Sequence, residues 1–330
     1  MNEKSSQRIL AVLIGIGLLF IVLLPLVVGR RGRDDDAPFP KAHPRPFRDY
    51  VPGRAHRLEK LPPELELLKP LAKPKHAPVM GEWLQAHPEQ GQTLGDFEQE
   101  RPAGGWHEGR VLYLVAVGVL TPAQESLVER TRALLSDWYQ LEVKVLPPLS
   151  EEIVPPESRR DRQNAFGTQW QTEPILDALL MKRPDDAAGL MAITATDLYP
   201  GPEWNFVFGE ARYGARVGVM SIARHGDLMT EPTLVLNRTL TTAAHELGHM
   251  MGLQHCVAYE CAMNGANSQE ESDQAPNEPC PSCLAKLKLR LGLNPLARAV
   301  AVERSYADAG LPLGDLPAQL DVWRDAGVVP

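Results

Sequence analysis

The residues most suggestive of chemistry lie in one short stretch with the pattern H-E-x-x-H-x-x-G-x-x-H, beginning at His245. At 3.6 residues per turn of helix, His245 and His249 are about 40° apart in azimuth and about 6 Å apart along the axis. Both imidazoles can therefore reach one metal ion. Glu246 is offset by about 100° from His245, so its carboxylate lies beside the ion and suits a group that takes a proton from a bound water.

A catalytic zinc site needs a third protein ligand and one open position. If the helix continued past His249, His255 would lie about 240° round the axis and about 9 Å further along, facing away from the ion. Glycine accepts the left-handed backbone conformation that ends a helix. We therefore expect the chain to turn at Gly252 and to bring His255 back to the other two imidazoles.

This arrangement predicts hydrolytic chemistry. Zinc held by three neutral imidazoles keeps a water, lowers its pKa towards about 7 and polarises a carbonyl group. Glu246 would act as the general base and pass the proton to a leaving amine. The alternative is a pair of satisfied histidines on the surface of an amphipathic helix, and the filling of all five pattern positions argues against it.

The four cysteines of the chain follow this stretch in two groups, Cys256 with Cys261 and Cys280 with Cys283. Four thiolates with a C-x-x-C spacing in the second group are typical of a closed, tetrahedral structural zinc site. Two disulfides are the alternative, which an exported domain would favour. We favour zinc, which would also tie the segment carrying His255 to the loop that follows.

With these residues in view, the chain resembles the archaemetzincins, a branch of the metzincin clan of zinc metallopeptidases. In that family the histidine pattern continues into C-x4-C-x-M and a later C-x-x-C. All these positions are filled here, by His245, Glu246, His249, Gly252, His255, Cys256, Cys261, Met263, Cys280 and Cys283. Residues 197–200 and 205–209 also resemble the family core, so the likeness covers roughly residues 81–291.

The resemblance implies two zinc ions per chain, one catalytic and one structural, and a peptide or protein substrate. It casts Met263 as the Met-turn residue, a hydrophobic base under the catalytic zinc. Some metzincins carry a tyrosine near the zinc shortly after this methionine, but Asn264, Gly265 and Ala266 follow it here.

The elements that must position these residues can be read from the apolar pattern. A buried strand from Arg110, a helix opened by the capping box that begins at Thr121, and a strand at residues 141–146 form a β-α-β unit. A further helix near residues 175–180 and a strand at 189–194 follow.

Near the site, residues 206–208 and 216–222 predict two short strands that could form a hairpin at a sheet edge. The helix that bears the histidines is predicted at about residues 237–251, because its apolar stripe recurs at helical spacing. The fold class is α/β or α+β. The resemblance sharpens this to a metzincin-like twisted mixed sheet with an active-site helix and a small, zinc-bound C-terminal subdomain.

The N-terminus begins with a tail at residues 1–8. Residues 9–29 carry no charge and are long enough to cross a hydrocarbon core of about 30 Å as a helix. We favour a membrane anchor over a cleaved signal peptide, whose apolar region is roughly 7 to 15 residues long and precedes a small-x-small site. The basic residues after the span favour, weakly, a cytoplasmic catalytic domain. The prediction is a single-pass membrane protein.

Residues 30–105 are rich in proline, which lacks the amide donor of helix and sheet, and are expected to form a spacer. The end of the spacer, about residues 81–105, has Trp83, Leu84, Leu94 and Phe97 to bury and is a candidate to pack on the metallopeptidase domain at 106–330.

The charge balance narrows the choice of function. Lys and Arg total 34 against 42 Asp and Glu, a net charge of −8 that offers no basic footprint for nucleic acid. Besides the peptidase, we consider a membrane-tethered, non-catalytic zinc-binding protein and a purely structural zinc module. The presence of Glu246 argues against the first, and the second would leave three histidines without a role.

Overall fold

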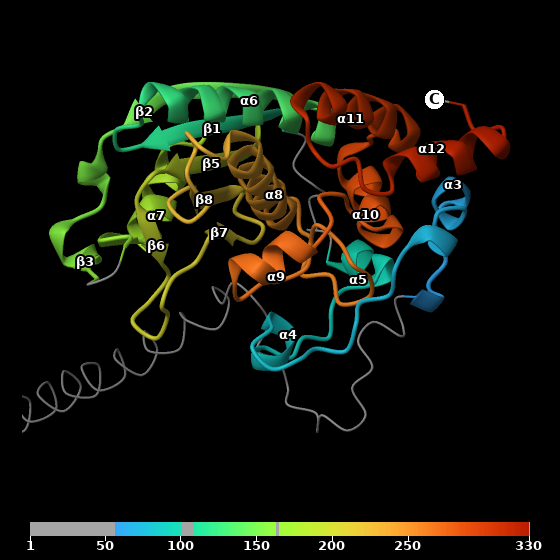
Figure 1. The fold of residues 1–330 in the computed structure, drawn as a ribbon, viewed down its shortest axis with the longest axis horizontal. Coiled ribbons are helices and arrows are strands. Elements are labelled where there is room, and N and C mark those ends of the chain that lie inside the picture. Colours follow the sequence, from blue (N-terminus) through green and yellow to red (C-terminus); the bar gives the residue numbers. More distant parts are fainter. Residues whose placement is uncertain (1–56, 101–108, 163–164, 330) are drawn as a thin grey trace, which may run out of the picture. The chain divides into compact units, whose positions relative to one another are not determined.

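The central sheet of the protein has five strands. The structure is a computed structural model that describes residues 57–100, 109–162 and 165–329. These residues belong to one compact unit. In spatial order the strands of the main sheet are β2 (Glu142–Leu149), β1 (Val111–Val117), β5 (Ala187–Thr194), β8 (Val217–Ser221) and β7 (Gly209–Arg212) (Figure 1).

The sheet is mixed, with one antiparallel strand at an edge. Strand β1 pairs in parallel with β2 and β5, and β5 pairs in parallel with β8. Strand β7 pairs antiparallel with β8, with Gly209 opposite Met220 and Arg212 opposite Val217. This confirms the predicted fold class and the antiparallel edge strand.

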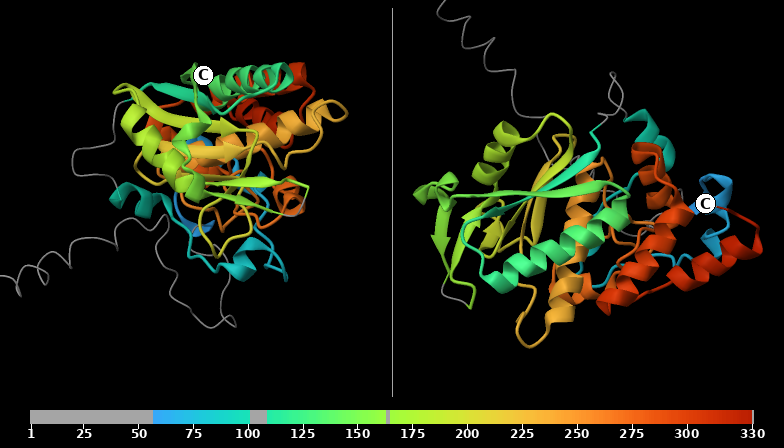
Figure 2. Two further views of the ribbon diagram at one scale, coloured as in Figure 1. Left: turned by 90° about the vertical axis from the view of Figure 1, so that its left-hand side faces the viewer. Right: turned by 90° about the horizontal axis from the view of Figure 1, so that it is seen from above.

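Helices cover both faces of the sheet (Figure 2). Helix α6 (Pro122–Tyr139) and helix α8 (Pro232–Met250) pack on one face, and α7 (Thr172–Lys182) packs on the other. Strand β1 belongs to both layers because successive side chains alternate: Leu112 and Leu114 join the core with α6 and α8, whereas Val115 and its alternating neighbours join the core with α7. The apolar run from Arg110 therefore forms a strand buried on both faces, as predicted.

Helix α6 begins as the sequence indicates. The Thr121 side chain accepts a hydrogen bond from the Gln124 N–H, and the Gln124 side chain accepts one from the Thr121 N–H, with proline at the first position. The helix packs on α8, where the Tyr139 hydroxyl donates to the Ala244 carbonyl at 2.6 Å. The β-α-β unit thus supports the helix that carries the histidines.

A second, three-stranded sheet lies beside the edge of the first. Its order is β3 (Arg159–Asp161), β4 (Thr168–Gln171) and β6 (Asp197–Tyr199). Arg224 joins this sheet to the loop after β8, because its guanidinium donates to both carboxylate oxygens of the buried Asp197 at 2.7 and 2.6 Å. The same guanidinium lies 3.7 Å from the ring centroid of Phe206.

The remaining α-helices of the described residues lie before β1 and after α8. Those before β1 are α3 (Pro63–Glu66), α4 (Trp83–Ala86) and α5 (Leu94–Gln99), and those after α8 are α9 (Gln269–Gln274), α10 (Pro281–Leu291), α11 (Pro295–Ala309) and α12 (Leu316–Asp325). Helix α10 contacts α3 and α5, so the two groups of helices pack on each other through α10 (Figure 1).

Two local predictions differ from the structure. The first strand of the predicted hairpin was placed at residues 206–208, but the strand spans Gly209–Arg212. Phe206 and Phe208 pack against each other with ring centroids 5.2 Å apart, and Phe206 stacks on Arg224, so this aromatic pair makes side-chain contacts in the loop before the edge strand. The histidine-bearing helix also begins earlier, at Pro232, since proline is accommodated in a first turn.

We correct the predicted membrane location. Within residues 57–100, 109–162 and 165–329, no helix combines the length and the apolar composition that a membrane crossing requires. The two long helices α6 and α8 are amphipathic, with charged residues such as Arg130 and Arg238 that would be costly in hydrocarbon. The predicted span at residues 9–29 lies outside the described residues.

Part of the predicted spacer is packed on the rest of the protein. Leu61, Leu65 and Leu68 lie in the main hydrophobic core, upstream of the 81–105 end that was the candidate for packing. Leu84 and Phe97 from that end are also buried. The packed chain therefore begins well before residue 106.

Candidate active site

Helix α8 presents two histidines side by side. Its buried stripe includes Leu240, Ala244 and Leu247, which fix the rotation of the helix against the sheet and α6. The rings of His245 and His249 are 4.6 Å apart, and their Nε2 atoms are 3.0 Å apart. The i, i+4 spacing thus brings the two imidazoles together as predicted.

The turn at Gly252 brings in the third histidine. Gly252 has a φ of +98°, the Gly252 N–H donates to the His249 carbonyl, and the Leu253 N–H donates to the Gly248 carbonyl. This is the Schellman arrangement that ends helices. It places the ring of His255 5.3 Å from that of His245 and 5.0 Å from that of His249, and one ligand atom from each histidine lies within 4.8 Å of those of the other two.

The hydrogen bonds of His245 and His249 show whether these rings suit a metal ion. Nδ1 of His245 lies 2.9 Å from the Ala262 carbonyl oxygen, and Nδ1 of His249 lies 2.7 Å from the Leu253 carbonyl oxygen. A carbonyl oxygen can only accept, so each Nδ1 carries the proton and each Nε2 carries a lone pair. Two lone pairs 3.0 Å apart repel unless a cation lies between them, so the donor set fits zinc.

The burial and the charge state of His245 and His249 also suit metal binding. Burial, with the nearby His255, lowers the pKa of His245 to about 4, and burial with the other two histidines lowers that of His249 well below its usual value. Both rings are therefore neutral at pH 7, the form that binds metals.

Glu246 is buried beside the histidines, with 6% of its surface exposed. It lies under the first residue of the edge strand: a Cβ added to Gly209 would come within 2.7 Å of the Glu246 Cγ and Oε1. Burial, followed by the negative charge of Glu210, raises the pKa of Glu246 to about 8. Such a carboxyl group exchanges protons near neutral pH, as a general acid–base group must.

The cysteines form the second cluster. Their Sγ atoms all lie within 4.8 Å of one another, those of Cys256 and Cys280 are 3.7 Å apart, and none forms a disulfide. A zinc tetrahedron with bonds of about 2.3 Å has edges of about 3.8 Å. The N–H of Cys280 points to the Cys261 Sγ at 3.2 Å, as is usual for a thiolate. Hydrogen bonds from the other cysteines lower the pKa of the Cys256 thiol, whereas burial raises the pKa values of Cys261 and Cys280.

Met263 lies beneath α8. It is fully buried, and its Sδ would be 2.4 Å from a Cβ added to Gly248, so the glycine between the two histidines makes room for it. The next residue, Asn264, holds the loop: its side chain accepts from the Cys261 N–H and donates to the Cys256 and Tyr259 carbonyls.

Comparison with known proteins identifies the family. The model of peptidase family M54 matches residues 115–289, which include both clusters. This chain belongs to that family. It is 32% identical to archaemetzincin-2 of Rattus norvegicus over 264 residues, which cover 69% of this chain and 72% of the relative. It is 30% identical to archaemetzincin-2 of Homo sapiens over 290 residues, covering 76% and 78%.

A solved structure of an archaemetzincin from Methanopyrus kandleri is 32% identical to this chain. The match between the two structures covers 58% of this chain and 99% of the Methanopyrus kandleri chain, with a TM-score of 0.46. Family membership confirms the predicted enzyme class, a zinc metallopeptidase, and the resemblance to archaemetzincins.

Three residues that contact the histidine and cysteine motifs were given no role in the sequence analysis. Glu89 lies 2.9 Å from Nδ1 of His255, and Gly209 lies against Glu246. Asn264 was noted only as a departure from the tyrosine pattern, yet it fixes the cysteine loop. A glycine opening a strand is the only one of these that leaves a signal in the sequence, because glycine in a strand marks a close approach.

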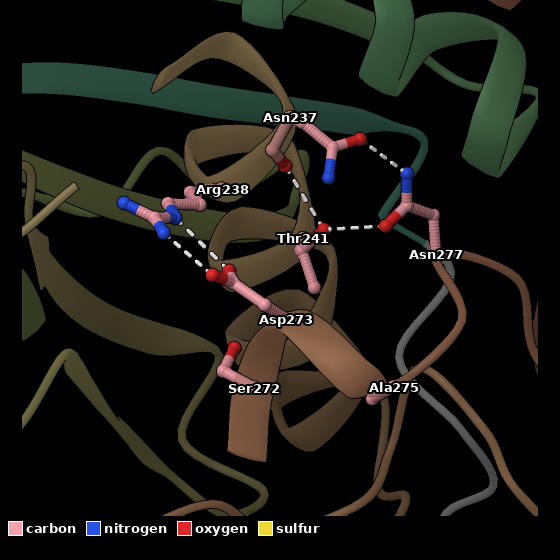
Figure 3. A pocket seen from close by; sticks show the side chains of 7 residues that line it. All are labelled: Asn237, Arg238, Thr241, Ser272, Asp273, Ala275 and Asn277. Carbon is pink, nitrogen blue, oxygen red and sulfur yellow. Dashed lines mark hydrogen bonds and ion pairs between the residues drawn. The ribbon is translucent and has the colours of Figure 1, made fainter. Parts of the chain in front are cut away.

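A small polar pocket lies elsewhere, between α8 and α9 (Figure 3). Arg238 pairs with Asp273 at 2.9 and 2.5 Å. Thr241 donates to Asn277, which in turn donates to Asn237. Since these groups satisfy one another, the pocket joins the α9 segment to α8, and we assign it no chemistry.

Proposed function

We propose that this chain hydrolyses peptide bonds with a catalytic zinc held by His245, His249 and His255 and with Glu246 as the general base. The observation that carries the proposal is the convergence of the three histidines. For His245 and His249 each Nδ1 is occupied by a carbonyl oxygen, which leaves Nε2 for the metal. Glu246 follows His245 directly and lies beside this centre.

When bound, zinc supplies a Lewis acid for the scissile carbonyl and an acidic water. The proton transfers are carried out by a residue of the chain. Glu246 takes the proton of the attacking water and delivers it to the leaving nitrogen. Its burial supports this role, because a shielded carboxyl group has a pKa close enough to 7 to gain and lose a proton in one cycle.

The substrate, in this proposal, is a peptide that lies along β7. This strand ends the five-stranded sheet of the described residues, so its outer edge offers backbone donors and acceptors to an extended chain. Gly209 at the start of β7 is in contact with Glu246. A peptide aligned on this edge would therefore pass the general base.

We further propose a second, structural zinc at Cys256, Cys261, Cys280 and Cys283. Its support is the spacing of the four sulfur atoms and their shared burial. Cys256 follows His255 directly, so this ion would hold the third histidine ligand in place.

Zinc analysis and a peptide-library cleavage assay of the full chain test the catalytic assignment. We expect two zinc ions per chain in the wild type. Glu246→Gln should keep both and lose cleavage by at least about 100-fold, the lower part of the range for general base catalysis. His245→Ala should retain one zinc and no activity. A wild-type level of cleavage in Glu246→Gln, or a zinc content that does not change in His245→Ala, would refute the assignment.

A further inference from the structure

Residues 73–92, which we call the belt, lie across the loop that follows α8. Pro74 forms an antiparallel bridge with Tyr259, with the Lys75 N–H donating to the Ala258 carbonyl and the Glu260 N–H donating to the Lys73 carbonyl. The belt is therefore attached to the segment between the first two cysteines. It lies outside residues 115–289, which match the family model.

The other half of the belt contacts helix α9, which follows this loop, and the start of the loop itself. The Trp83 N–H donates to both carboxylate oxygens of Glu271 at 3.0 Å. The Gln92 side chain donates to the Gly252 carbonyl at 3.2 Å and accepts from the Gln254 N–H at 3.3 Å. The belt thus contacts the turn that brings in the third histidine.

Glu89 of the belt faces His255 directly. Both of its carboxylate oxygens lie near His255 Nδ1, at 2.9 and 3.0 Å, and the Trp83 indole N–H donates to Oε1 at 2.8 Å. The edge of the Trp83 ring packs on His255 with centroids 5.1 Å apart. His255 has only 6% of its side chain exposed, so this contact is shielded from water.

The acceptor on His255 differs from those on the other two histidines. His245 and His249 donate to neutral backbone carbonyls, whereas His255 donates to a carboxylate. An ionised carboxylate can accept hydrogen bonds but cannot donate them. Glu89 therefore keeps the proton of His255 on Nδ1 and leaves Nε2 free to face the metal. It also makes the imidazole a stronger ligand, and partners of this kind affect metal affinity by roughly 10- to 100-fold.

We propose that Glu89 is the positioning residue of the third zinc ligand, so that the belt, outside the matched family region, completes the catalytic centre. This inference rests on the proposed function, since it assigns Glu89 a role only if His255 binds the catalytic zinc. Glu89 does not touch the substrate. It acts through His255, by fixing the tautomer and the ring orientation.

The experiment compares two matched substitutions in the full chain, Glu89→Gln and Glu271→Gln. Each removes the negative charge of a carboxylate that accepts a hydrogen bond from Trp83, and each leaves an amide oxygen as an acceptor, but only Glu89 contacts a proposed zinc ligand. Zinc affinity is measured by competition with a chelator, and the protonated nitrogen of His255 is identified by ¹⁵N NMR after the chelator has removed the histidine-bound zinc.

We expect Glu89→Gln to weaken one of the two zinc sites by roughly 10- to 100-fold, to leave the cysteine-bound zinc in place, and to lower kcat more than it raises KM. Glu89→Asp should be intermediate, because it restores the charge on a shorter side chain. Glu271→Gln should stay within about threefold of the wild type in both affinities, a small change on the scale of such partners. Without the histidine-bound zinc, the His255 ring should carry its proton on Nδ1 in the wild type and should be a mixture of the two tautomers in Glu89→Ala, which has no acceptor at this position.

Two outcomes separate this inference from the proposed function. If the wild type holds no zinc that depends on His245, both proposals fail together. If the wild type holds that zinc and cleaves peptides, while Glu89→Gln binds it as tightly as the wild type, the role of Glu89 alone is refuted. An equal loss in Glu89→Gln and Glu271→Gln would also refute it, since the effect would then be that of anchoring the belt.

Discussion

Gly209 in the edge strand lies directly against Glu246 on the active-site helix. A Cβ at position 209 would be 2.7 Å from the Glu246 Cγ and Oε1 and 2.8 Å from its Cδ. Real Cβ atoms do not approach so closely, and the carboxyl group cannot retreat freely because Glu246 is buried. The edge strand that would bind the substrate and the proposed base therefore fit together only with glycine at this position.

Gly209→Ala should accordingly displace the Glu246 carboxylate and lower kcat/KM by about 100-fold, the cost of a catalytic group moved by about 1 Å. The zinc content should not change, since no zinc ligand is touched. Steady-state cleavage of a fluorogenic peptide measures the effect. Gly201→Ala is the matched control, because a Cβ there meets no atom of the described part of the chain within 4 Å. Equal activities of the two variants would show that the contact at Gly209 has no catalytic role.

Gly248→Ala should strain the contact between α8 and Met263, whose Sδ would lie 2.4 Å from the new Cβ. Overpacking of this kind costs about 1–3 kcal/mol, and the better helix propensity of alanine returns up to about 1 kcal/mol. We expect a net loss of about 1 kcal/mol in the free energy of unfolding, measured in urea. Met263→Ala should make room, so the double variant should be more stable than the sum of the two single changes predicts. Simple additivity would argue against the contact.

Cys280→Ser should remove one zinc per chain and lower the free energy of unfolding by more than about 3 kcal/mol, as the loss of a structural metal does. The reason is that the cysteine cluster joins the loop after His255 to the start of α10. Calorimetry with zinc analysis measures both effects. Ser282→Ala, between Cys280 and Cys283, is the control, because the Ser282 Oγ has no hydrogen-bond partner among the residues that the structure describes. A zinc content of two in Cys280→Ser would rule out the four-cysteine site.

Acid should destabilise the fold through His225. This ring is fully buried against Thr239, at 3.0 Å, and burial, with the charge of Arg238, lowers its pKa to about 3. In the unfolded chain its pKa is about 6.5. Between these values the unfolded state binds one more proton, so stability falls as the pH falls from about 6.5 towards about 3, by at most about 1.4 kcal/mol per pH unit.

The test is the difference between wild type and His225→Gln in urea unfolding at several pH values and one zinc concentration. The glutamine amide can still form a hydrogen bond with the Thr239 hydroxyl but does not titrate. The free energy of unfolding of His225→Gln should therefore change less steeply with pH than that of the wild type, by the equivalent of about one bound proton. Parallel slopes would mean that His225 does not contribute to acid sensitivity.

The sequence alone determined the parts of the site that depend on local geometry. His245 and His249 come together through the helical repeat, and His255 joins them through the left-handed turn at Gly252. The capping box at Thr121 and the apolar run of β1 are equally local, so they too were predicted correctly. All of these features follow from backbone stereochemistry within a few turns of chain.

Tertiary structure decided the contacts between distant segments. Glu89 is 166 residues from His255 in the chain, and Gly209 meets Glu246 only because β7 packs over α8. Contacts between distant segments also explain why the edge strand lies later than predicted and why leucines of the predicted spacer are buried. Apolar patterns and proline content indicate which secondary structure a segment can form. They do not indicate which distant segment it packs against, because that depends on how the whole hydrophobic core is buried.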